Sequence, residues 1–589
     1  MYKNFNFLNL NEFKKFLTIL DAKEKKNLFL VFLLMVIASL LEMMSIGIVF
    51  PLINFLFNPD VKSNGIFNSN VKYFEDFATV DYINLVLILI FVVYSLKVLF
   101  TIFYTYFNTK VMLDLKSNIT SKLFKTYLKE NYLFHLNKNS ALLIRNIQQE
   151  TSELINSFLS PLLTFALSLM TTFFIILLLF YYSFLSSLIV VFIFGFLGFL
   201  LNAFVRDKLK MIGEKRQVHQ YGMLKNLQQG LSLIKEIKLT SKESFFLEKF
   251  NFHNTALIPH GIKRAIYGNM PKLMFEYLFI LIFIFVIFYL NQTKTPFEEF
   301  FPIFTIYALA SFRIIPGLSN LSRAYQKIKV ALPALQLVVN EMTEKEKLND
   351  ENQTNIINQS MKFNESLDLK EISFKYSEKQ EFVLDKLNLK IKKNSIIGII
   401  GDNAAGKSTL LNLICGLTKP TTGKILIDGK NIFDNLNSWQ KSIGLIPQSI
   451  YLIDGNVKNN IALGVLEKDI DNEKIEGLMK LTGLAETINQ GDLVGERGKN
   501  ISGGQKQKIG IARALYVEPK ILILDEATSA MDVDSEENLT ETIFNKSNVK
   551  TLIIITHRQK ILKYCDYIYK LENKNISLIE KTEIAKNII

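Results

Sequence analysis

Cysteine is almost absent from this 589-residue chain, and this limits how the fold can be held together. The only two cysteines, Cys415 and Cys565, lie in the second half, so no disulfide framework is expected. The chain also lacks a zinc knuckle, an RNA-binding signature and any interleaving of aromatic and basic residues, so we expect no nucleic-acid partner. Its formal charge of +13 is better explained by the basic cytosolic loops of a membrane protein.

A cleavable signal peptide is also missing. The first 27 residues carry six lysines, and the apolar run that follows is longer than the apolar core of a signal peptide. No small-residue cleavage pattern ends that run. We therefore expect it to remain in the protein as a membrane span.

Six apolar segments are long enough to be membrane-spanning helices, which need about 20 apolar residues. They occupy approximately residues 28–57, 82–107, 157–181, 184–204, 273–290 and 298–318. Only Tyr181–Ser183 separates the third from the fourth, which predicts a tight hairpin. The last segment is the least typical, because it contains Arg313 and Pro316.

The segments between these spans divide by length and charge. Residues 58–81 and 291–297 are short, and the first is acidic. Residues 108–156 and 205–272 are long and basic, and the second of them has 13 Lys or Arg against 5 Asp or Glu. The positive-inside rule then predicts that both termini and both long segments are cytoplasmic.

Helical spacing of apolar residues continues into the long segments, in Leu142–Glu153 and Met223–Ile237. We expect spans two to five to extend as helices into the cytosol and to turn at tips near Tyr132–Ser140 and Gly230–Lys242. On the outer side, the apolar residues of Val71–Val80 share one helical face. That segment is either a short helix lying on the membrane surface or an ordinary loop.

Ionisable residues within the predicted spans cost about 2.5–3.5 kcal/mol each on an insertion scale, so they usually serve a cavity or a partner. The cations are Lys97, Lys272, Arg313 and Arg323, and the anions are Glu42 and Glu276. At about 1.5 Å per residue, Lys97, Lys272 and Arg313 fall in the cytoplasmic half of the membrane core. They predict a belt that binds an anionic head group. Alternatively, these side chains reach the membrane interface or form pairs, such as Lys272 with Glu276.

A polar segment without apolar periodicity, residues 341–365, predicts a linker. Beyond it, apolar strands alternate with amphipathic helices. The predicted fold class is therefore a transmembrane domain of six α-helices with long cytosolic extensions (1–340), followed after the linker by an α/β domain (366–589).

The phosphate-loop pattern is carried by Gly401–Thr409, GDNAAGKST. Glycines let backbone N–H groups converge on a polyphosphate, Lys407 reaches the terminal phosphates and Ser408 offers a hydroxyl to Mg²⁺. The apolar run Ile396–Ile400 precedes the loop as a buried parallel strand, and a helix follows with its N-terminus toward the anion. The predicted cofactors are ATP and Mg²⁺. The predicted ligands in this loop are Gly401, Asn403, Gly406, Lys407, Ser408 and Thr409.

Two further motifs place polar groups next to helices and strands. ILILDE ends an apolar strand in Asp525, positioned to hold Mg²⁺, and Glu526, positioned to orient or deprotonate the attacking water. ISGGQ opens a helix and predicts an anion site at its N-terminus. That site comprises Ser502, Gly503, Gly504 and Gln505. Taken alone, each motif also fits a helix cap or a surface turn.

Three single residues complete the candidate set. Gln448 follows Pro447 in a turn after a strand, and is a candidate for both catalysis and Mg²⁺ binding. His557 ends the strand Leu552–Ile555, and Tyr376 precedes the phosphate loop and is placed to stack on adenine. By itself, such a Gln is usually a turn residue and such a His is usually structural.

In this order and spacing, the motifs resemble the nucleotide-binding domain of ATP-binding-cassette proteins. Gln448 matches the family's glutamine loop, ISGGQ its signature and His557 its switch histidine. The stretch Val494–Gly498 (VGERG) resembles the exporter subclass, and the six spans followed by one cassette resemble bacterial half-transporters. Three residues depart from the family pattern. Ile501 and Met531 replace leucines, and Ala404 replaces a glycine that many cassettes have.

The resemblance implies an exporter that works as a homodimer, in which the signature of one chain closes on ATP held by the phosphate loop of the other. Both sites should hydrolyse ATP, because Glu526 is present. The resemblance also implies a multi-pass protein of the bacterial inner membrane with a cytoplasmic ATPase domain.

The stretches around Glu42 (LLEMMSIGIVFPLI) and Arg313 (SFRIIPGLSNL) resemble the lipid-linked oligosaccharide flippases of bacterial N-glycosylation. This implies that the cargo is a polyprenyl-pyrophosphate-linked glycan moved from the cytoplasmic to the outer leaflet, with membrane lipids as partners. An exporter of another lipid, a drug or a peptide is the alternative, and an ATP-gated channel or regulator is a third interpretation.

Overall fold

The computed structural model describes residues 10–49, 79–182, 184–293, 297–353, 361–378, 381–495, 498–526, 541–542, 544, 549–556 and 558–579. The chain divides into two compact units. The first comprises Met1–Glu130 and Lys138–Asn349, and the second Asn131–Asn137 and Asp350–Ile589.

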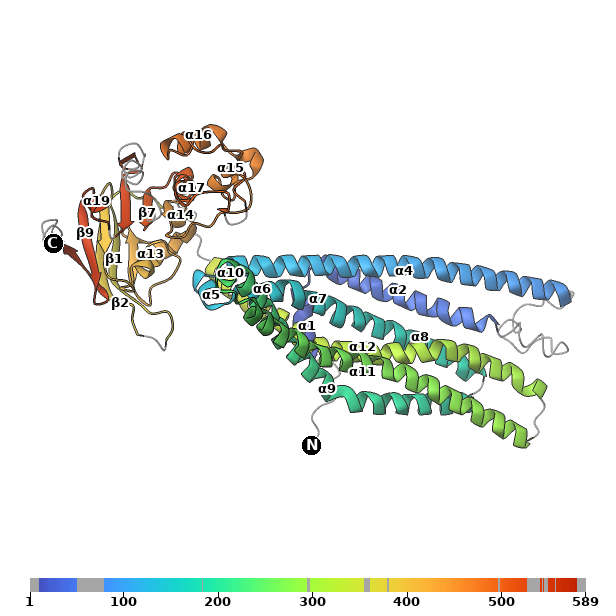
Figure 1. Ribbon diagram of the computed structural model, residues 1–589. Coiled ribbons are helices and arrows are strands. Elements are labelled where there is room, and N and C mark those ends of the chain that lie inside the picture. The colour runs from blue at the N-terminus through green and yellow to red at the C-terminus, as the bar shows by residue number, and fades with distance from the viewer. Residues whose placement is uncertain are drawn as a thin grey trace. The chain divides into compact units, whose positions relative to one another are not determined.

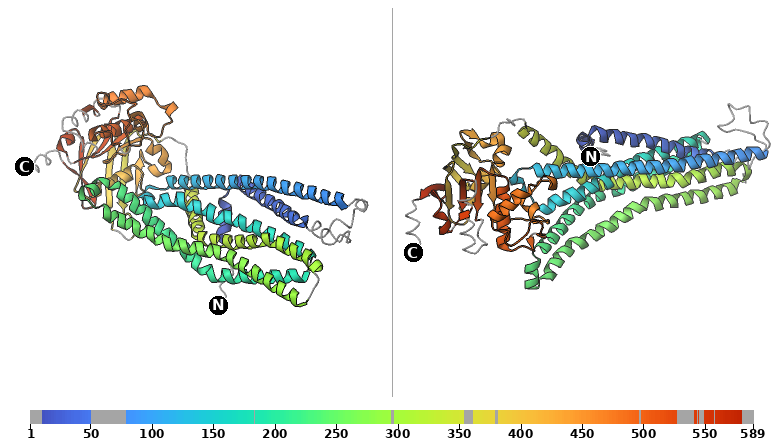
Figure 2. Two further views of the ribbon diagram at one scale, coloured as in Figure 1. Left: turned by 45° about the vertical axis from the view of Figure 1, so that its right-hand side comes forward. Right: turned by 90° about the horizontal axis from the view of Figure 1, so that it is seen from above.

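Long helices build the first unit and run side by side in Figures 1 and 2. They are α2 (Ala22–Gly47), α4 (Thr79–Lys129), α8 (Ser160–Tyr182), α9 (Phe184–Ser232), α11 (Glu243–Thr293) and α12 (Phe297–Gln353). The shorter elements are α1 (Leu10–Ile19), α6 (Ser140–Arg145), η2 (Asn146–Glu150), α7 (Thr151–Glu153), η3 (Leu154–Leu159) and α10 (Ile234–Thr240). Each of the six predicted spans therefore falls on a helix where the structure describes it.

Four helical stretches among the described residues are long and apolar enough to cross a membrane. They are Ala22–Gly47, Ile83–Lys129, Ser140–Tyr181 and Glu243–Phe285. These correspond to the first, second, third and fifth predicted spans, so the transmembrane character of the first unit is confirmed. The fourth and sixth predicted spans lie on α9 and α12, outside these four, and remain predictions as membrane spans.

The helices are much longer than a membrane is thick, as the amphipathic pattern of the long segments predicts. α4 and α11 each have 51 residues, or about 76 Å at 1.5 Å per residue, against a hydrocarbon core of about 30 Å. The two predicted tips coincide with short helices, α10 and α5 (Tyr132–Asn137). Helix α5 belongs to the second unit, where Leu133 packs against its core.

A buried ion network ties the helical turns after α6 to α9. The carboxylate of Glu150 has no exposed side-chain surface and lies 3.7 Å from Arg145 and 3.5 Å from Arg216. Gln217 donates a hydrogen bond to it at 2.8 Å, and Arg216 also pairs with Glu153 at 2.8 Å. Glu150 is the last residue of the π-helical segment η2. The wider turn of a π-helix cannot be predicted from the spacing of apolar residues.

Two sheets and their covering helices form the second unit. The first sheet is antiparallel, in the order β2–β1–β4–β5, and the second has the order β10–β9–β3–β8–β7–β6. Strands of the first sheet are β1 (Ser366–Phe374), β2 (Leu384–Lys392), β4 (Thr422–Ile427) and β5 (Lys430–Asn431). Strands of the second are β3 (Ile396–Ile400), β6 (Ile443–Ile446), β7 (Ile521–Asp525), β8 (Thr551–Ile555), β9 (Tyr567–Glu572) and β10 (Asn575–Ile579).

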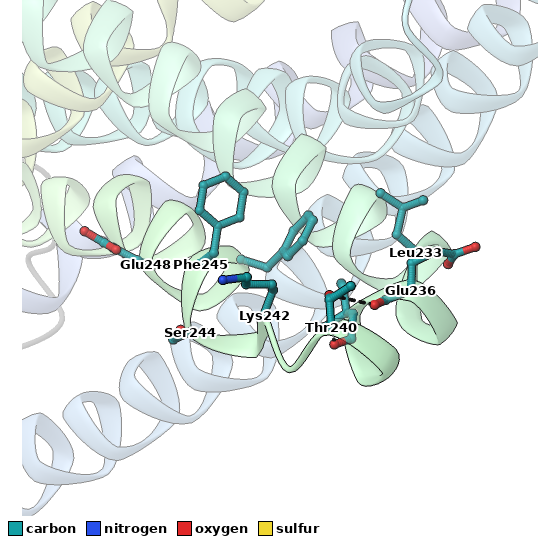
Figure 3. Close-up of a pocket in the computed structure, with 9 residues that line it drawn as sticks. Leu233, Glu236, Thr240, Lys242, Ser244, Phe245 and Glu248 are labelled. Atoms are coloured by element: carbon teal, nitrogen blue, oxygen red, sulfur yellow. Dashed lines mark hydrogen bonds between the residues drawn. The ribbon is translucent and has the colours of Figure 1, made fainter.

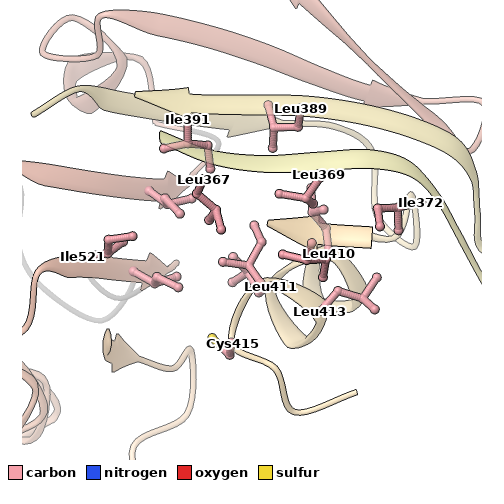
Figure 4. Close-up of a cluster of buried hydrophobic side chains, with 14 of the residues drawn as sticks. Leu367, Leu369, Ile372, Leu389, Ile391, Leu410, Leu411, Leu413, Cys415 and Ile521 are labelled. Atoms are coloured by element: carbon pink, nitrogen blue, oxygen red, sulfur yellow. The ribbon is translucent and has the colours of Figure 1, made fainter. Parts of the chain in front are cut away.

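Helix α13 (Lys407–Ile414) packs into the core between these sheets, as Figure 4 shows. Leu410, Leu411 and Leu413 are buried against residues of β1 and β2 and against Ile521 of β7. The remaining helices include α14 (Leu436–Gln440), α15 (Val457–Ile461), α16 (Asn472–Leu481), α17 (Gly503–Tyr516) and α19 (Gln559–Leu562). The 3-10 turns are η4 (Ile432–Asn435) and η5 (Glu467–Asp469).

The segment predicted as a linker, residues 341–365, begins within a helix, because α12 continues to Gln353. Residues 341–353 are therefore helical although they lack an apolar period. Their Lys, Glu and Gln residues have good helix propensity, and they extend a helix that is already nucleated. Several predictions lie outside the described residues: most of the outer segment 71–80, Glu496 and Arg497 of VGERG, and Met531.

Candidate functional site

The parallel part of the second sheet brings distant motifs to one edge. β9, β3, β8, β7 and β6 are neighbours in that order and all pair in parallel, so their carboxyl ends meet at the same side. The phosphate loop follows β3, Asp525 ends β7 and Gln448 follows β6. Ligands of open α/β sheets bind at this edge.

Glycine is required at two positions of the phosphate loop. A Cβ on Gly401 would lie 2.5 Å from the carbonyl oxygen of Leu571. Gly406 has φ +106°, and a Cβ there would lie 3.1 Å from Leu384. The loop is therefore held close to neighbouring strands, and α13 begins directly after it, which leaves its first N–H groups for an anion.

Lys407 crosses the loop and holds it closed. Its buried ammonium donates to the carbonyl oxygens of Gly401 and Asp402. Ser408 is exposed at the start of α13, whereas Thr409 is buried. Asn403 lies in the exposed turn of the loop. This arrangement fits a polyphosphate, because the lysine, the N–H groups and the Ser408 hydroxyl all come from one short segment.

Ala404 occupies the left-handed region, with φ +66°. For alanine that conformation costs about 1–2 kcal/mol, whereas glycine adopts it freely. The departure from the family pattern noted in the sequence therefore falls at a backbone position that favours glycine.

Two predicted catalytic residues, 78 positions apart in sequence, meet at the sheet edge. Gln448 donates a hydrogen bond from Nε2 to Oε2 of Glu526 at 2.7 Å. Glu526 is half-buried and has φ +48°, and its N–H donates to the carbonyl of Ile555. The sharp turn after β7 thus points two adjacent carboxylates out of one strand end.

The pKa of Asp525 is raised by burial and by the negative charge of Glu526, and the nearby Lys407 opposes that rise. The half-buried carboxylate of Asp525 and the exposed hydroxyl of Ser408 are oxygen donors that fit Mg²⁺. This ion usually takes one or two protein ligands and completes its shell with water and phosphate oxygens. The predicted ligands Ser408, Gln448 and Asp525 all lie at this edge.

Tyr376 lies against the helix that follows the phosphate loop. Its hydroxyl is 2.8 Å from Oγ1 of Thr409, and its ring packs edge-on to Phe374. The tyrosine, 25 positions before the loop in sequence, is thereby fixed next to the phosphate-binding segment.

The ISGGQ motif forms a complete helix cap. Ser502 accepts a hydrogen bond from N–H of Gln505 at 3.2 Å, and Gln505 accepts one from N–H of Ser502 at 2.9 Å. Gly503 and Gly504 are the first residues of α17. The cap interpretation and the anion-site interpretation are thus compatible, because both use the same helix N-terminus. His557 lies outside the described residues.

Two of the four predicted substrate cations come together in the membrane unit, and an acidic residue joins them. Glu42 of α2 lies 2.8 Å from Lys97 of α4 and 2.8 Å from Arg313 of α12. Lys97 is buried and also donates to the hydroxyl of Ser45 at 3.1 Å. We call Glu42, Lys97, Arg313 and Ser45 the charge cluster. Its net charge is +1, from two cations and one anion.

The other two predicted cations have separate partners. Lys272 pairs with Glu276 at 3.7 Å along α11, the alternative that the spacing of four residues indicates. Arg323 donates to the side chain of Asn320 at 2.8 Å. Lys97 and Arg313 therefore lie together in the structure, and the belt that would also include Lys272 remains a prediction. The role of Ser45 was missed from the sequence, although it follows Glu42 by three residues, which places both on one helix face.

The tip at α10 has a surface hollow of about 510 Å³, which Figure 3 shows. Leu233, Thr240 and Phe245 are among the residues that line it. Thr240 caps the last turn of α10 by donating to the carbonyl of Glu236 at 2.7 Å.

Comparison with known proteins identifies both parts of the chain. Residues 384–529 match the family model described as ABC transporter, and residues 28–312 match the model described as ABC transporter transmembrane region. An ATP-dependent lipid A-core flippase of Ralstonia nicotianae is 25% identical over 486 residues, which are 80% of each chain. ABC transporter B family member 29, chloroplastic, of Arabidopsis thaliana is 35% identical over 279 residues, 46% of this chain and 43% of that one.

A solved structure shares the fold over nearly the whole length. A bacterial Atm1-family ABC exporter with ATP bound superposes with a TM-score of 0.77 and 20% sequence identity, and the match covers 96% of both chains.

Proposed function

The chain belongs to the ABC transporters, and from this premise we propose that it is an ATP-driven flippase that moves a polyprenyl-pyrophosphate-linked oligosaccharide from the cytoplasmic to the outer leaflet of the bacterial inner membrane. Family membership alone implies a membrane transporter whose ATPase domain hydrolyses ATP. The cargo and the roles of individual residues are the proposed part.

In the ATPase domain, Lys407 exchanges its loop carbonyls for the β- and γ-phosphates, and the N–H groups of Gly406 to Thr409 bind the same phosphates. Ser408, Asp525 and Gln448 would hold Mg²⁺, and the bound ion would supply positive charge next to the phosphoryl group. Glu526 orients the attacking water, and its hydrogen bond to Gln448 fixes the carboxylate. Tyr376 stacks on adenine, and His557 is the proposed switch residue.

Two copies of the chain are needed for a complete site. One chain has one phosphate loop and one ISGGQ motif, and the helix cap at Ser502 presents N–H groups that fit the γ-phosphate of ATP held by a second copy. The proposed unit is a homodimer with two equivalent hydrolytic sites. The short helices α5 and α10 transmit closure of the ATPase domains to the spans, which the grouping of α5 with the second unit supports.

The charge cluster carries the proposal about cargo. Its two cations outnumber its single carboxylate, and Arg313 exposes 48% of its side chain while Lys97 is buried. An anionic head group can therefore contact the exposed Arg313 directly, and the positive charge of the buried Lys97 adds to the electrostatic attraction. Charge-assisted hydrogen bonds to phosphate are strong in a site where water screens them poorly. A homodimer has two such clusters, which suits a pyrophosphate.

A different phosphate-bearing lipid is the second candidate. The relative from Ralstonia nicotianae is named a lipid A-core flippase, and the charge cluster would serve either head group. An exporter of drugs or peptides and an ATP-gated channel or regulator remain the alternatives.

The test is ATPase stimulation of the purified protein in lipid nanodiscs. We expect polyprenyl-pyrophosphate-linked oligosaccharide to stimulate hydrolysis more than a lipid A-core glycolipid or a hydrophobic drug does. Arg313→Gln should lose most of the stimulation and keep the basal rate, whereas Lys272→Gln, a matched cation outside the charge cluster, should keep both. Greater stimulation by the lipid A-core glycolipid would favour the second candidate. Stimulation by the drug alone would refute both.

A further inference from the structure

Three of the five histidines of the chain lie together on two helices, and none of the three belongs to either site described above. His219 is on α9, and His253 and His260 are on α11. The ring centroids of His219 and His253 are 5.5 Å apart, and those of His219 and His260 are 6.3 Å apart. We propose that His219 and His253 form a binding site for a divalent transition-metal ion of the Zn²⁺ class.

The geometry of the two nitrogens carries this proposal. Nδ1 of His219 lies 3.2 Å from Nδ1 of His253, so the two ring nitrogens are close enough to bind one ion. Two metal–nitrogen bonds of about 2.0–2.1 Å that span this separation enclose an angle of about 100°, close to the tetrahedral angle that Zn²⁺ prefers. Imidazole donors suit Zn²⁺, Cu²⁺ and Ni²⁺ far better than Mg²⁺ or Ca²⁺.

A third histidine and a glycine complete the arrangement. Nδ1 of His260 is buried and has no hydrogen-bond partner within the described part of the chain. No three His, Cys, Asp or Glu side chains in that part converge on one point, so the proposed site is a two-histidine chelate whose other positions water would fill. The ring of His253 fits against α9 only because residue 222 is glycine. A Cβ there would lie 2.4 Å from ring atoms Cε1 and Nε2.

The site lies on the cytosolic extensions. His219 is 35 residues from Phe184, the outer end of α9, or about 52 Å, and His253 is 40 residues from Thr293, or about 60 Å. Both distances exceed a hydrocarbon core of about 30 Å. A bound ion therefore joins α9 to α11 in water-accessible protein and restrains the pair of helices that leads to α10.

The experiment measures Zn²⁺ binding to the full-length protein without a polyhistidine tag, in nanodiscs and without nucleotide, by titration calorimetry. We expect the wild type to bind one Zn²⁺ per chain at this site, at least tenfold more tightly than any site left in the His219→Ala/His253→Ala variant. His135→Ala, which removes an exposed histidine outside the cluster, should bind as the wild type does. Zn²⁺ should raise the unfolding temperature of the wild type and of His135→Ala, but not that of the double variant.

Gly222→Ala keeps all three imidazoles and displaces the ring of His253, so it should also weaken binding at least tenfold. This variant decides the question if the double variant fails to fold. Equal affinity and stoichiometry in the wild type and either site variant would overturn the proposal and leave the two histidines as a hydrogen-bonded pair. The ATPase rate plays no part in the measurement, so its outcome is independent of the cargo proposal.

Discussion

A single methyl group at residue 404 puts strain into the phosphate loop. Ala404 has φ +66°, where alanine costs about 1–2 kcal/mol and glycine costs only its greater loss of backbone freedom, about 0.5–1 kcal/mol. The two effects oppose each other, and the strain is the larger one.

We therefore expect Ala404→Gly to stabilise the nucleotide-free protein by about 0.5–1 kcal/mol, seen as a rise in the unfolding temperature of the ATPase domain. Ala405 is the control, because its φ is not positive. Ala405→Gly adds freedom to the unfolded chain and relieves nothing, so it should lower that temperature. A fall for both variants would show that Ala404 is not strained.

Asp525 predicts a pH dependence. Its folded-state pKa lies above its ordinary value because of burial and of Glu526, so the ionised form costs folding free energy. That cost is fully present above the folded pKa, shrinks as the pH falls through it, and is gone below the ordinary value of about 3.9. Asp525→Asn removes the charge, so it should raise the unfolding temperature of the nucleotide-free protein at pH 8.

The gain should be smaller at pH 5 than at pH 8, and differential scanning fluorimetry at both pH values measures it. Asp402→Asn, which changes an exposed residue of the phosphate loop, is the control variant. A gain that grows as the pH falls would contradict the assigned direction of the pKa shift.

At the scale of elements, Glu150 is the residue on which the contact between η2 and α9 depends. Its carboxylate is fully buried between Arg145 and Arg216, and removing one partner of a buried ion network costs about 3–5 kcal/mol. Glu150→Gln should therefore lower the unfolding temperature of the membrane unit by several degrees. Glu153→Gln, at a partly exposed position, should cost much less.

Circular dichroism melts of the purified protein measure both variants. Equal, small effects would mean that the Glu150 carboxylate is not needed to compensate the two arginines, and the network would then be unimportant for stability.

Helices and strands could be predicted from the sequence where the spacing of apolar residues or a fixed motif indicated them. Apolar runs predicted the helices, and the short tips near 132–140 and 230–242 became α5 and α10. The polar continuation of α12 to Gln353 could not be predicted, since propagating a nucleated helix needs no apolar face. The π-helical turns of η2 and η3 depend on tertiary packing, which no local pattern records.

The nucleotide site and the charge cluster also differ in how far local sequence patterns predict them. The order and spacing of the motifs predict one nucleotide site that includes Gln448, Asp525 and the phosphate loop, and the parallel strands bring all three to one sheet edge. The charge cluster could only be half predicted, because residue counts along the predicted spans give only the expected depth of Lys97 and Arg313. Depth does not give the rotation of a helix about its axis, and rotation decides that both cations face Glu42.

At the scale of the whole molecule, sites shared between two chains can be tested with mixed dimers. Lys407→Ala damages a phosphate loop and Ser502→Ala damages a signature. If each site takes its loop from one chain and its signature from the other, both lesions on one chain leave two sites with one lesion each. Lesions on separate chains leave one doubly damaged site and one intact site.

Equilibrium ATP binding to the two tandem-linked dimers should therefore differ. The separate-chain dimer should bind one ATP with wild-type affinity, whereas the one-chain dimer should bind none with that affinity. Identical binding curves would contradict shared sites. The reverse result, with one ATP bound at wild-type affinity by the one-chain dimer and none by the separate-chain dimer, would show that each site lies within one chain.

The most direct test of the proposed function is transport itself, measured in proteoliposomes as ATP-dependent movement of polyprenyl-pyrophosphate-linked oligosaccharide across the bilayer. Glu526→Gln keeps the shape of the side chain and allows the contact with Gln448, but removes the charge that is proposed to orient water. We predict that the wild type moves the lipid only with hydrolysable ATP, and that Glu526→Gln binds ATP but moves none. Movement by Glu526→Gln at the wild-type rate, or no movement by an ATPase-active wild type, would contradict the proposal.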